Sequence, residues 1–499
     1  MISIRCRRWS GWLLLACIFT MYPGDTIVGE EPNEEGQVRT WTDATGQYSV
    51  EGVLAGTDKD VVRIRRTQDG RVIEVPFSKL SRGDQRWLRD EIERRRKPAL
   101  EASKPAKAST PEPAEAAGDW PGFRGPNRDG RSPDRGLVKE WPAEGPKLLW
   151  KKDNIGKGYS SVAVAKGKVY ITGDRDGKLV LSTFDLDGNP QWEANVDAAW
   201  TGDHPGARST PTIDGDSVYL ESGNGVVGCC DARTGKAKWS TSLRELGGQV
   251  PNWGYSESVL IYKDLAIVTP GGARCIVALN KNSGKPVWTS QGFQAGAHYS
   301  SNYLFNFGGT DVVTNGTGEG IVGLDAKTGK TLWSNPFSSG NTANCPTPVF
   351  SDGYVFWANG YGKGGVCLKL SGNARSISAK EAWQTRDMVC HHGGYIVDQG
   401  YIYGNNNNAW VCLDLKTGKK LWEERAVGKG SACEADGMLY LFSEEGGRAG
   451  LASYSPDGLS MKGTFTVEGE GPSWAHPVVI GGRLYLRYDT NLYCFDVRG

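Results

Sequence analysis

The chain has 499 residues, including 68 glycines and 18 tryptophans, and a formal net charge of +1. This length exceeds one ordinary domain and allows large cores to be buried, while the balanced charge gives no reason to expect a nucleic-acid partner. Many glycines with many aromatic residues are typical of an all-β protein with tight turns.

Residues 1–29 are predicted to form an export signal. Arginines at positions 5, 7 and 8 precede an apolar core, Trp12 to Met21, that is too short to span a bilayer comfortably. Cleavage before Glu30 would release the chain to the periplasm, the cell envelope or the medium. The stretch Leu14–Cys17 also resembles a lipoprotein cleavage box, so a lipid anchor at Cys17 is the alternative, with the protein then peripheral to a membrane.

Residues 37–97 are predicted to form a small β-barrel followed by a helix. Alternating strands at 61–66 and 71–76 flank an Asp69-Gly70 turn, and a helix is expected from Arg82 to Arg96 with Ser81 as its N-cap. The opening Trp41-Thr42-Asp43, this turn and the run 75–81 resemble the Sla-type homology domain, which is an SH3-like barrel. The resemblance implies protein binding, and a spacer role remains the alternative.

Residues 98–118 are predicted to be a linker. Lysine, proline, alanine and glutamate dominate this segment. Such a composition cannot bury enough apolar surface to fold, so we expect an extended, mobile connection.

From residue 119 onward, one ten-residue pattern recurs, and it is clearest at Cys230–Trp239, Leu324–Trp333 and Leu413–Trp422. Its Asp can accept hydrogen bonds from nearby backbone amides and its Gly can take a positive φ, which predicts a hairpin turn. Its final Trp is expected to pack on a neighbouring unit. The repeat tryptophans, spaced by 39 to 50 residues, are Trp150, Trp192, Trp239, Trp288, Trp333, Trp383 and Trp422.

A period of 40 to 50 residues with about four short strands per repeat is typical of β-propeller blades. Residues 119–499 are therefore predicted to form an eight-bladed β-propeller, with seven blades as the alternative count. Two β-sandwiches are the competing interpretation, which the fixed phase of the tryptophans disfavours. The last repeat, at Cys494, lacks its Trp strand, and Trp150 lacks preceding strands. Joining the two would close the ring without a free edge.

The Asp-x-x-Thr-Gly-Lys-x-x-Trp repeat resembles the tryptophan-docking repeat of pyrroloquinoline-quinone (PQQ) propellers. The lead-in Trp120–Gly130 resembles a group of exported bacterial PQQ-like propellers. Two kinds of protein share the repeat: quinoprotein alcohol and sugar dehydrogenases, and non-enzymatic propellers such as the outer-membrane β-barrel assembly lipoprotein. For the enzymes, the resemblance implies a vicinal disulfide and a Trp stacked on the quinone, Glu and Asn ligands for Ca²⁺, and an Asp base.

Cys229-Cys230 is the candidate for that disulfide, and its register argues against the assignment. Cys229 aligns with Cys412 and Cys494 in the repeat, so the pair falls in a third strand with its side chains on opposite faces. We interpret these thiols, with Cys367, as core residues. No catalytic residue is identified, and no cofactor is predicted; PQQ with Ca²⁺ would be required if the chain were a dehydrogenase.

Segments that precede the first strand of each blade should meet at the mouth of the central channel. The candidate ligand-binding residues there are Arg208, Trp253, Tyr255, Glu257, His298, His391, His392, Trp474 and His476. They predict a polar pocket with aromatic walls for a small ligand, a sugar or a metal. The competing interpretation is that small polar residues simply fit a narrow solvated channel. Because adjacent strand residues face opposite ways, His391 and His392 are not expected both to point inward, and no metal site is assigned.

The favoured function is that of an exported, non-enzymatic propeller that binds a protein, a glycan or a small ligand at the channel mouth. The alternative is a PQQ-dependent alcohol or sugar dehydrogenase with a divergent active site.

Overall fold

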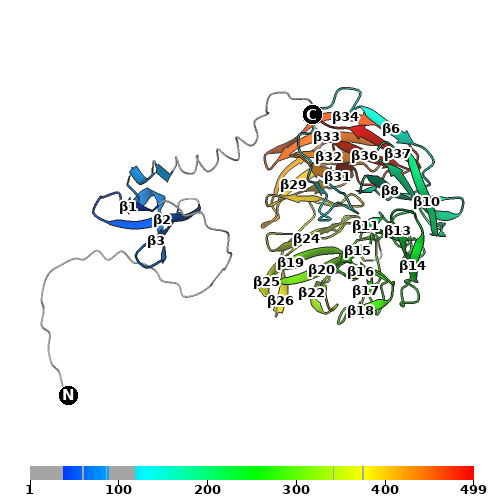
Figure 1. Ribbon diagram of the computed structural model, residues 1–499, viewed down its shortest axis with the longest axis horizontal. Coiled ribbons are helices and arrows are strands. Elements are labelled where there is room, and N and C mark those ends of the chain that lie inside the picture. The colour runs from blue at the N-terminus through cyan, green and yellow to red at the C-terminus, as the bar shows by residue number, and fades with distance from the viewer. Residues whose placement is uncertain are drawn as a thin grey trace, which may run out of the picture. The chain divides into compact units, whose positions relative to one another are not determined.

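The computed structural model describes residues 38–58, 61–81, 83–85, 87–88, 118–340, 342–373 and 376–499 (Figure 1). The chain divides into two compact units, residues 1–112 and 113–499, which are treated separately below. The predicted export signal, Cys17 and nearly all of the predicted linker lie outside the described residues. Within the described ranges, no helix is both long and apolar enough to cross a membrane.

The first unit is a four-stranded antiparallel sheet in the order β1-β2-β3-β4. Its elements are β1 Arg39–Thr42, β2 Ser49–Asp58, β3 Val61–Arg66, β4 Val72–Pro76 and the 3₁₀ helix η1 Phe77–Lys79. Trp41 is buried in its core and meets Trp87 edge to face at 5.5 Å. The predicted SH3-like barrel is therefore confirmed.

A helix follows this sheet, and its predicted cap is present. The Oγ atom of Ser81 accepts a hydrogen bond from the backbone N–H of Asp84 at 3.1 Å. The Asp84 carboxylate also pairs with Arg39 at 2.5 Å, which ties the helix to β1. Residues 83–85 and 87–88 are helical, and the predicted continuation to Arg96 lies outside the described residues.

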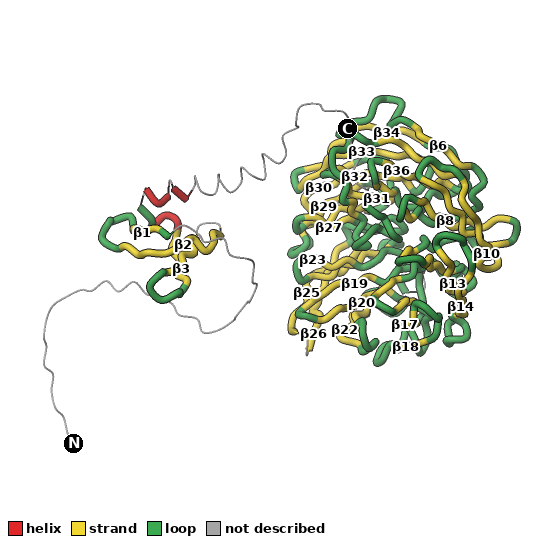
Figure 2. The backbone as a smooth tube through the Cα atoms, viewed as in Figure 1, coloured by secondary structure: helices red, strands yellow, loops and turns green. Residues whose placement is uncertain are grey.

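In the described residues of the second unit the regular elements are strands, which form eight sheets joined by loops and turns (Figure 2). Sheets 1 to 4 consist of β7 Ala163–Ala165, β8 Lys168–Arg175, β9 Lys178–Asp185 and β10 Pro190–Ala198; β11 Thr212–Asp214, β12 Ser217–Glu221, β13 Val226–Asp231 and β14 Ala237–Ser242; β15 Leu260–Tyr262, β16 Leu265–Val268, β17 Val277–Asn280 and β18 Pro286–Thr289; and β19 Tyr303–Phe307, β20 Thr310–Gly316, β21 Ile321–Asp325 and β22 Thr331–Asn335.

Sheets 5 to 8 consist of β23 Val349–Ser351, β24 Tyr354–Asn359, β25 Gly364–Asn373 and β26 Ser376–Thr385; β27 Ile396–Asp398, β28 Tyr401–Asn405, β29 Trp410–Asp414 and β30 Lys420–Glu424; β31 Gly430–Ala435, β32 Met438–Ser443, β33 Arg448–Ser455, β34 Gly458–Thr466 and β5 Arg131–Ser132; and β35 Val478–Ile480, β36 Arg483–Tyr488, β37 Asn491–Asp496 and β6 Leu148–Lys152. The predicted all-β propeller is confirmed.

The recurring turn has the predicted chemistry. In Leu413–Trp422, the Asp414 side chain accepts hydrogen bonds from the N–H groups of Lys416 and Thr417 at 3.1 and 2.8 Å. Gly418 takes a φ of +72°. A Cβ atom at Gly418 would lie 2.6 Å from the indole of Trp383. Glycine is thus required twice, for the backbone conformation and for the close approach of a tryptophan from the preceding sheet.

Four repeat tryptophans also bond to the following sheet. Their indole N–H groups donate to carbonyls in its turn: Trp150 to Leu186 at 2.8 Å, Trp239 to Lys281 at 2.9 Å, Trp383 to Leu415 at 3.0 Å and Trp422 to Ser455 at 2.8 Å. The indole nitrogens of Trp192, Trp288 and Trp333 are buried without such a partner in the described residues. These contacts connect successive sheets around the ring.

Each recurring cysteine lies opposite one of these tryptophans. The cross-strand pairs are Cys229 with Trp239, Cys367 with Trp383, Cys412 with Trp422 and Cys494 with Trp150. All four thiols are free and buried. The interpretation of these cysteines as core residues is confirmed.

The ring closes through sheet 8, where β6 from the start of the unit pairs with β37 from its end. A belt of side-chain hydrogen bonds continues across the junction. The backbone N–H of His476 donates to Ser161 Oγ at 2.9 Å, that of Ser161 to Thr210 Oγ1 at 3.0 Å, and that of Thr210 to Ser258 Oγ at 3.0 Å. These small polar residues therefore satisfy backbone groups of adjacent sheets at the inner wall.

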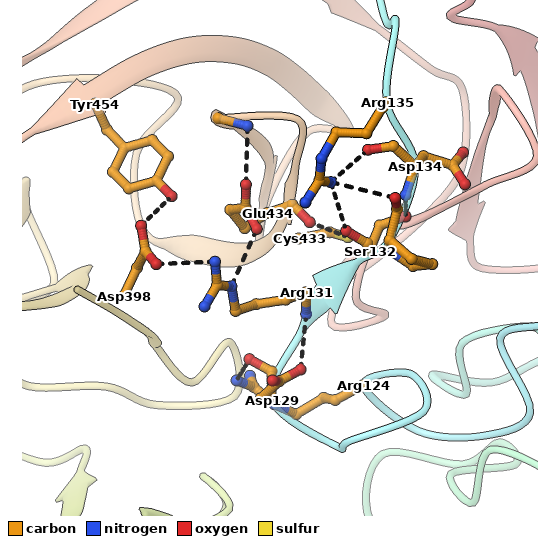
Figure 3. Close-up of polar contacts among 12 residues, drawn as sticks. Arg124, Asp129, Arg131, Ser132, Asp134, Arg135, Asp398, Cys433, Glu434 and Tyr454 are labelled. Atoms are coloured by element: carbon orange, nitrogen blue, oxygen red, sulfur yellow. Dashed lines mark hydrogen bonds and ion pairs between the residues drawn. The ribbon is translucent and has the colours of Figure 1, made fainter. Parts of the chain in front are cut away.

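The lead-in segment 118–132 spans the inside of the ring. Arg128 donates to the carbonyl of Ser258, just before sheet 3, and Arg124 donates to that of Tyr395, just before sheet 6. The segment ends as β5, which pairs in parallel with β31. Figure 3 shows Arg131 held between Asp398, at 2.8 Å, and Glu434, at 3.1 Å. The central channel is therefore crossed by the chain's own lead-in.

Candidate functional site

A pocket of about 300 Å³ lies at the inner wall of the ring. Its walls come mainly from the segments that precede the first strands, with a contribution from every sheet except sheet 7. The pocket brings together six of the nine candidate residues: Arg208, Trp253, His391, His392, Trp474 and His476. Phe123, from the lead-in segment, also lines it and meets the His476 ring at 5.1 Å.

The other three candidates do not line this pocket. Tyr255 is buried and donates its hydroxyl to the carbonyl of Pro270 at 2.8 Å. The Glu257 carboxylate is buried and accepts the N–H of Thr269 at 2.7 Å. His298 Nδ1 lies 2.7 Å from the amide nitrogen of Asn344.

Alternation along extended backbone explains this division. In the segment before β15, Ser256 and Ser258 face the pocket, so Tyr255 and Glu257 face away. In the segment before β19, Tyr299 and Ser301 line the pocket, which directs His298 away from it. The repeat predicted which segments line the pocket. It did not predict which of their alternating side chains face the pocket.

Aromatic rings form a continuous wall on one side of the pocket. His392 stacks on Trp474 with centroids 4.0 Å apart at 25°. Tyr159 packs on the same indole at 4.7 Å, and Tyr361 meets the His391 ring at 4.8 Å. Stacked faces of this kind contact the apolar face of a sugar ring or a flat side chain.

Arg208 is the arginine of the pocket, and backbone oxygens hold its guanidinium. It donates to the carbonyls of Asp203, His204 and Gly206, and its Cζ lies 5.7 Å from the Tyr159 ring centroid. Burial lowers the pKa of Arg208 to about 10, so it remains charged at neutral pH. Its main structural role is to shape the loop at residues 203–206.

Both histidines of the 391–392 pair face the pocket, which corrects the expectation that only one would do so. The residues lie in a bend before β27 and not in a strand, so strand alternation does not apply. Their Nδ1 atoms lie 3.5 and 3.6 Å from the two carboxylate oxygens of Glu444. Glu444 follows β32, and Lys429 Nζ lies 3.1 Å from its carboxylate. Neither Glu444 nor Lys429 was a candidate: Glu444 follows a second strand, and Lys429 was not singled out although it directly precedes β31.

Two pocket histidines, His392 and His476, hold a proton less tightly than free imidazole does. Burial lowers the pKa of His392 to about 4 and that of His476 to about 3. Burial acts to raise the pKa of Glu444, but the facing imidazoles of His391 and His392 and the charge of Lys429 hold it well below its usual range. At neutral pH, His392 and His476 in the pocket lining are therefore neutral, and the ionised Glu444 carboxylate, which is not among the lining residues, lies next to the histidine pair.

A pH prediction follows for His298, whose pKa burial lowers to about 4. Its neutral form is favoured in the folded state, so its contribution to stability is complete above pH 6.5 and is lost as the pH falls from 6.5 toward 4. The loss is about 1.4 kcal/mol per pH unit, reduced to about 1 kcal/mol by solvent at this half-buried side chain. Urea denaturation at pH 7 and pH 5 should show the wild type losing more stability than His298→Gln. Parallel losses would contradict the pKa assignment.

The PQQ and Ca²⁺ of the quinoprotein enzymes do not fit the residues present. Cys229 and Cys230 are adjacent residues of β13, both free and buried, and neither lines the pocket. The described lining contains no Asp, Glu or Asn side chain, although hard cations such as Ca²⁺ take oxygen ligands. The pocket thus has neither the stacking disulfide nor the calcium ligands.

Comparisons with known proteins agree with this fold. The family model for outer membrane protein assembly factor BamB, of the PQQ-repeat type, matches residues 131–245 and 180–424, and the model for SLA1 homology domain 1 matches residues 29–95. The outer membrane protein assembly factor BamB of Bordetella pertussis is 23% identical over 332 residues, which cover 56% of this chain and 86% of that protein.

Solved structures show the same fold at low identity. BamB from Moraxella catarrhalis gives a TM-score of 0.53 at 18% identity and covers 70% of this chain and 97% of that one. The quinohemoprotein alcohol dehydrogenase from Comamonas testosteroni gives a TM-score of 0.54 at 15% identity, over 76% and 81% of the two chains. This chain therefore belongs to the PQQ-repeat propeller family of outer membrane protein assembly factor BamB, and it carries an SLA1 homology domain 1 at its N-terminus.

Proposed function

We propose that this protein is a non-enzymatic binding propeller whose ligand inserts one ring or side chain into the pocket at the channel mouth. The observation that carries the proposal is the stacked wall of Trp474, His392 and Tyr159. A volume of about 300 Å³ lies at the small end of ligand sites. It suits a single sugar residue of a glycan or one side chain of a partner protein.

The name of the similar proteins, an assembly factor, supports a protein partner. The fold shared with quinohemoprotein dehydrogenases supports the alternative of an enzyme, but fold alone does not carry function. The lack of pocket carboxylates and the position of the Cys229-Cys230 pair favour binding without a quinone.

The proposed organisation has an export signal at 1–29, the SH3-like unit at 37–97, a linker at 98–118 and the propeller at 119–499. Export would place the propeller in the periplasm, the cell envelope or the medium, with a lipid anchor at Cys17 as the alternative. A flexible linker would let the two units bind different partners at once and gain avidity.

The test is ligand binding by the full chain and by Trp474→Ala. Tryptophan fluorescence and calorimetry with oligosaccharides and peptides should reveal saturable binding that weakens roughly 10- to 100-fold in the variant, because ring stacking and aromatic burial are lost. Leu421→Ala, at a position 36% exposed, is the control and should bind as the wild type does.

Addition of PQQ and Ca²⁺ to the same protein tests the alternative of a dehydrogenase. We expect neither a thermal shift nor reduction of a dye with alcohols or sugars. Stoichiometric retention of the quinone together with dye reduction would overturn the proposal in favour of the dehydrogenase.

A further inference from the structure

The pair His391 and His392 makes an unusual cluster with Glu444. One ligand atom from each residue can be chosen so that all three lie within 4.8 Å of one another. The Glu444 residue is only 6% exposed, so its charge is largely removed from water. A buried carboxylate beside two imidazoles is the donor set that binds zinc and related metal ions in proteins.

The distances from the two imidazoles to Glu444 are longer than those of strong hydrogen bonds and close to those between ligands of one metal ion. The Nδ1 atoms of His391 and His392 lie 3.5 and 3.6 Å from the Glu444 oxygens, beyond the 2.7–3.2 Å typical of hydrogen bonds. Ligand atoms around a tetrahedral zinc ion lie about 3.3 Å apart, given bonds of about 2.0–2.1 Å. Small side-chain rotations would bring the atoms to that spacing.

An unused nitrogen atom gives independent support. His392 Nδ1 faces Glu444, is buried and has no hydrogen-bond partner in the described residues. Buried polar atoms are normally satisfied, so an imidazole nitrogen left free beside a carboxylate needs an explanation. A bound cation would provide the missing partner, and both rings also face the pocket, which leaves a coordination position open to a ligand.

Lys429 occupies the space between Glu444 and His391 that a metal ion would take. Its Nζ lies 3.1 Å from both Glu444 Oε2 and His391 Nδ1. Its ammonium group balances the Glu444 charge when no metal is bound, and it must move aside when a divalent ion enters. Its long, flexible side chain makes such a displacement feasible.

We propose that His391, His392 and Glu444 form a site for a divalent transition-metal ion, with Zn²⁺ as the preferred ion, in the wall of the channel-mouth pocket. The site goes beyond the proposed binding function and does not depend on which organic ligand the pocket takes. The metal would present an open coordination position to an oxygen or nitrogen atom of that ligand.

The experiment titrates Zn²⁺ and Co²⁺ into the metal-free full chain, followed by calorimetry and by the visible absorption of bound Co²⁺. We expect one ion per chain with micromolar or tighter affinity. Glu444→Gln and His392→Ala should each weaken binding by roughly 10- to 100-fold, as loss of a ligand or its supporting group does. His298→Ala is the matched control, because that histidine lies off the pocket, and it should bind as the wild type does.

Lys429→Met separates a metal site from a purely structural ion pair. Removal of the competing positive charge should tighten Zn²⁺ binding roughly tenfold or more. Circular dichroism verifies that each variant is folded, and Glu444→Gln keeps the shape of the side chain. Absence of stoichiometric Zn²⁺ binding by the wild type, or binding that survives unchanged in folded His392→Ala, would overturn the proposal.

Discussion

Replacement of Trp333 by alanine should lower the free energy of unfolding of the propeller by about 3–5 kcal/mol. Trp333 is 5% exposed and belongs to a core cluster that spans sheets 4, 5 and 6. A Cβ atom at the facing Gly323 would lie 2.1 Å from the indole, so the ring packs directly on backbone. Because backbone cannot collapse into the space that the ring leaves, most of the cavity should persist.

Urea denaturation followed by circular dichroism measures this loss. Val287→Ala is the control, because Val287 is adjacent to a repeat tryptophan but 55% exposed, and it should change stability by less than about 0.5 kcal/mol. A loss below about 1 kcal/mol in Trp333→Ala would show that the repeat tryptophans are not the main contacts between sheets.

Replacement of Arg124 by methionine should cost about 3–5 kcal/mol, because it would leave several buried carbonyl groups without donors. Arg124 is 3% exposed and donates to the carbonyls of Arg128, Asp129 and Tyr395 at 3.3, 2.9 and 2.6 Å. These bonds hold the lead-in segment across the ring. Arg124→Lys should recover only part of the loss, because an ammonium group lacks the fork of the guanidinium.

Arg135→Met is the matched control for this prediction. Arg135 also donates to main-chain carbonyls near the lead-in, but at the exposed surface. Its loss should therefore cost under about 0.5 kcal/mol. Equal stabilities of the Arg124 and Arg135 variants, measured by the same denaturation, would contradict the role assigned to the lead-in segment.

The fold could be predicted because the repeat encodes its own local geometry. Asp414 and Gly418 shape a turn within a few residues, and the phase of Trp422 marks the contact with the next unit. Ring closure could also be predicted, because the repeat at Cys494 lacks its Trp strand and the Trp150 strand lacks the strands that normally precede it. Local turn chemistry and periodicity are properties of a sequence alone.

The candidate site was predictable only in part. The repeat phase located the segments that form the pocket, but it did not decide which alternate side chains face it, so Tyr255, Glu257 and His298 were included. Glu444 and Phe123 lie outside that phase: Glu444 meets the histidine pair between the neighbouring sheets 6 and 7, and Phe123 reaches the pocket through the path of the lead-in segment. Such contacts depend on three-dimensional curvature, for which the sequence contains no short-range signal.

The pairing of β6 with β37 has a consequence for synthesis on the ribosome. Trp150 emerges roughly 340 residues before its partner Cys494, a delay of roughly 20 to 70 s at common elongation rates. During that time β6 has an unpaired edge, and the inner faces of the first sheets have no closing neighbour. The ring of a nascent propeller of this design therefore cannot close, and its first sheets cannot be fully covered, until β37 is made.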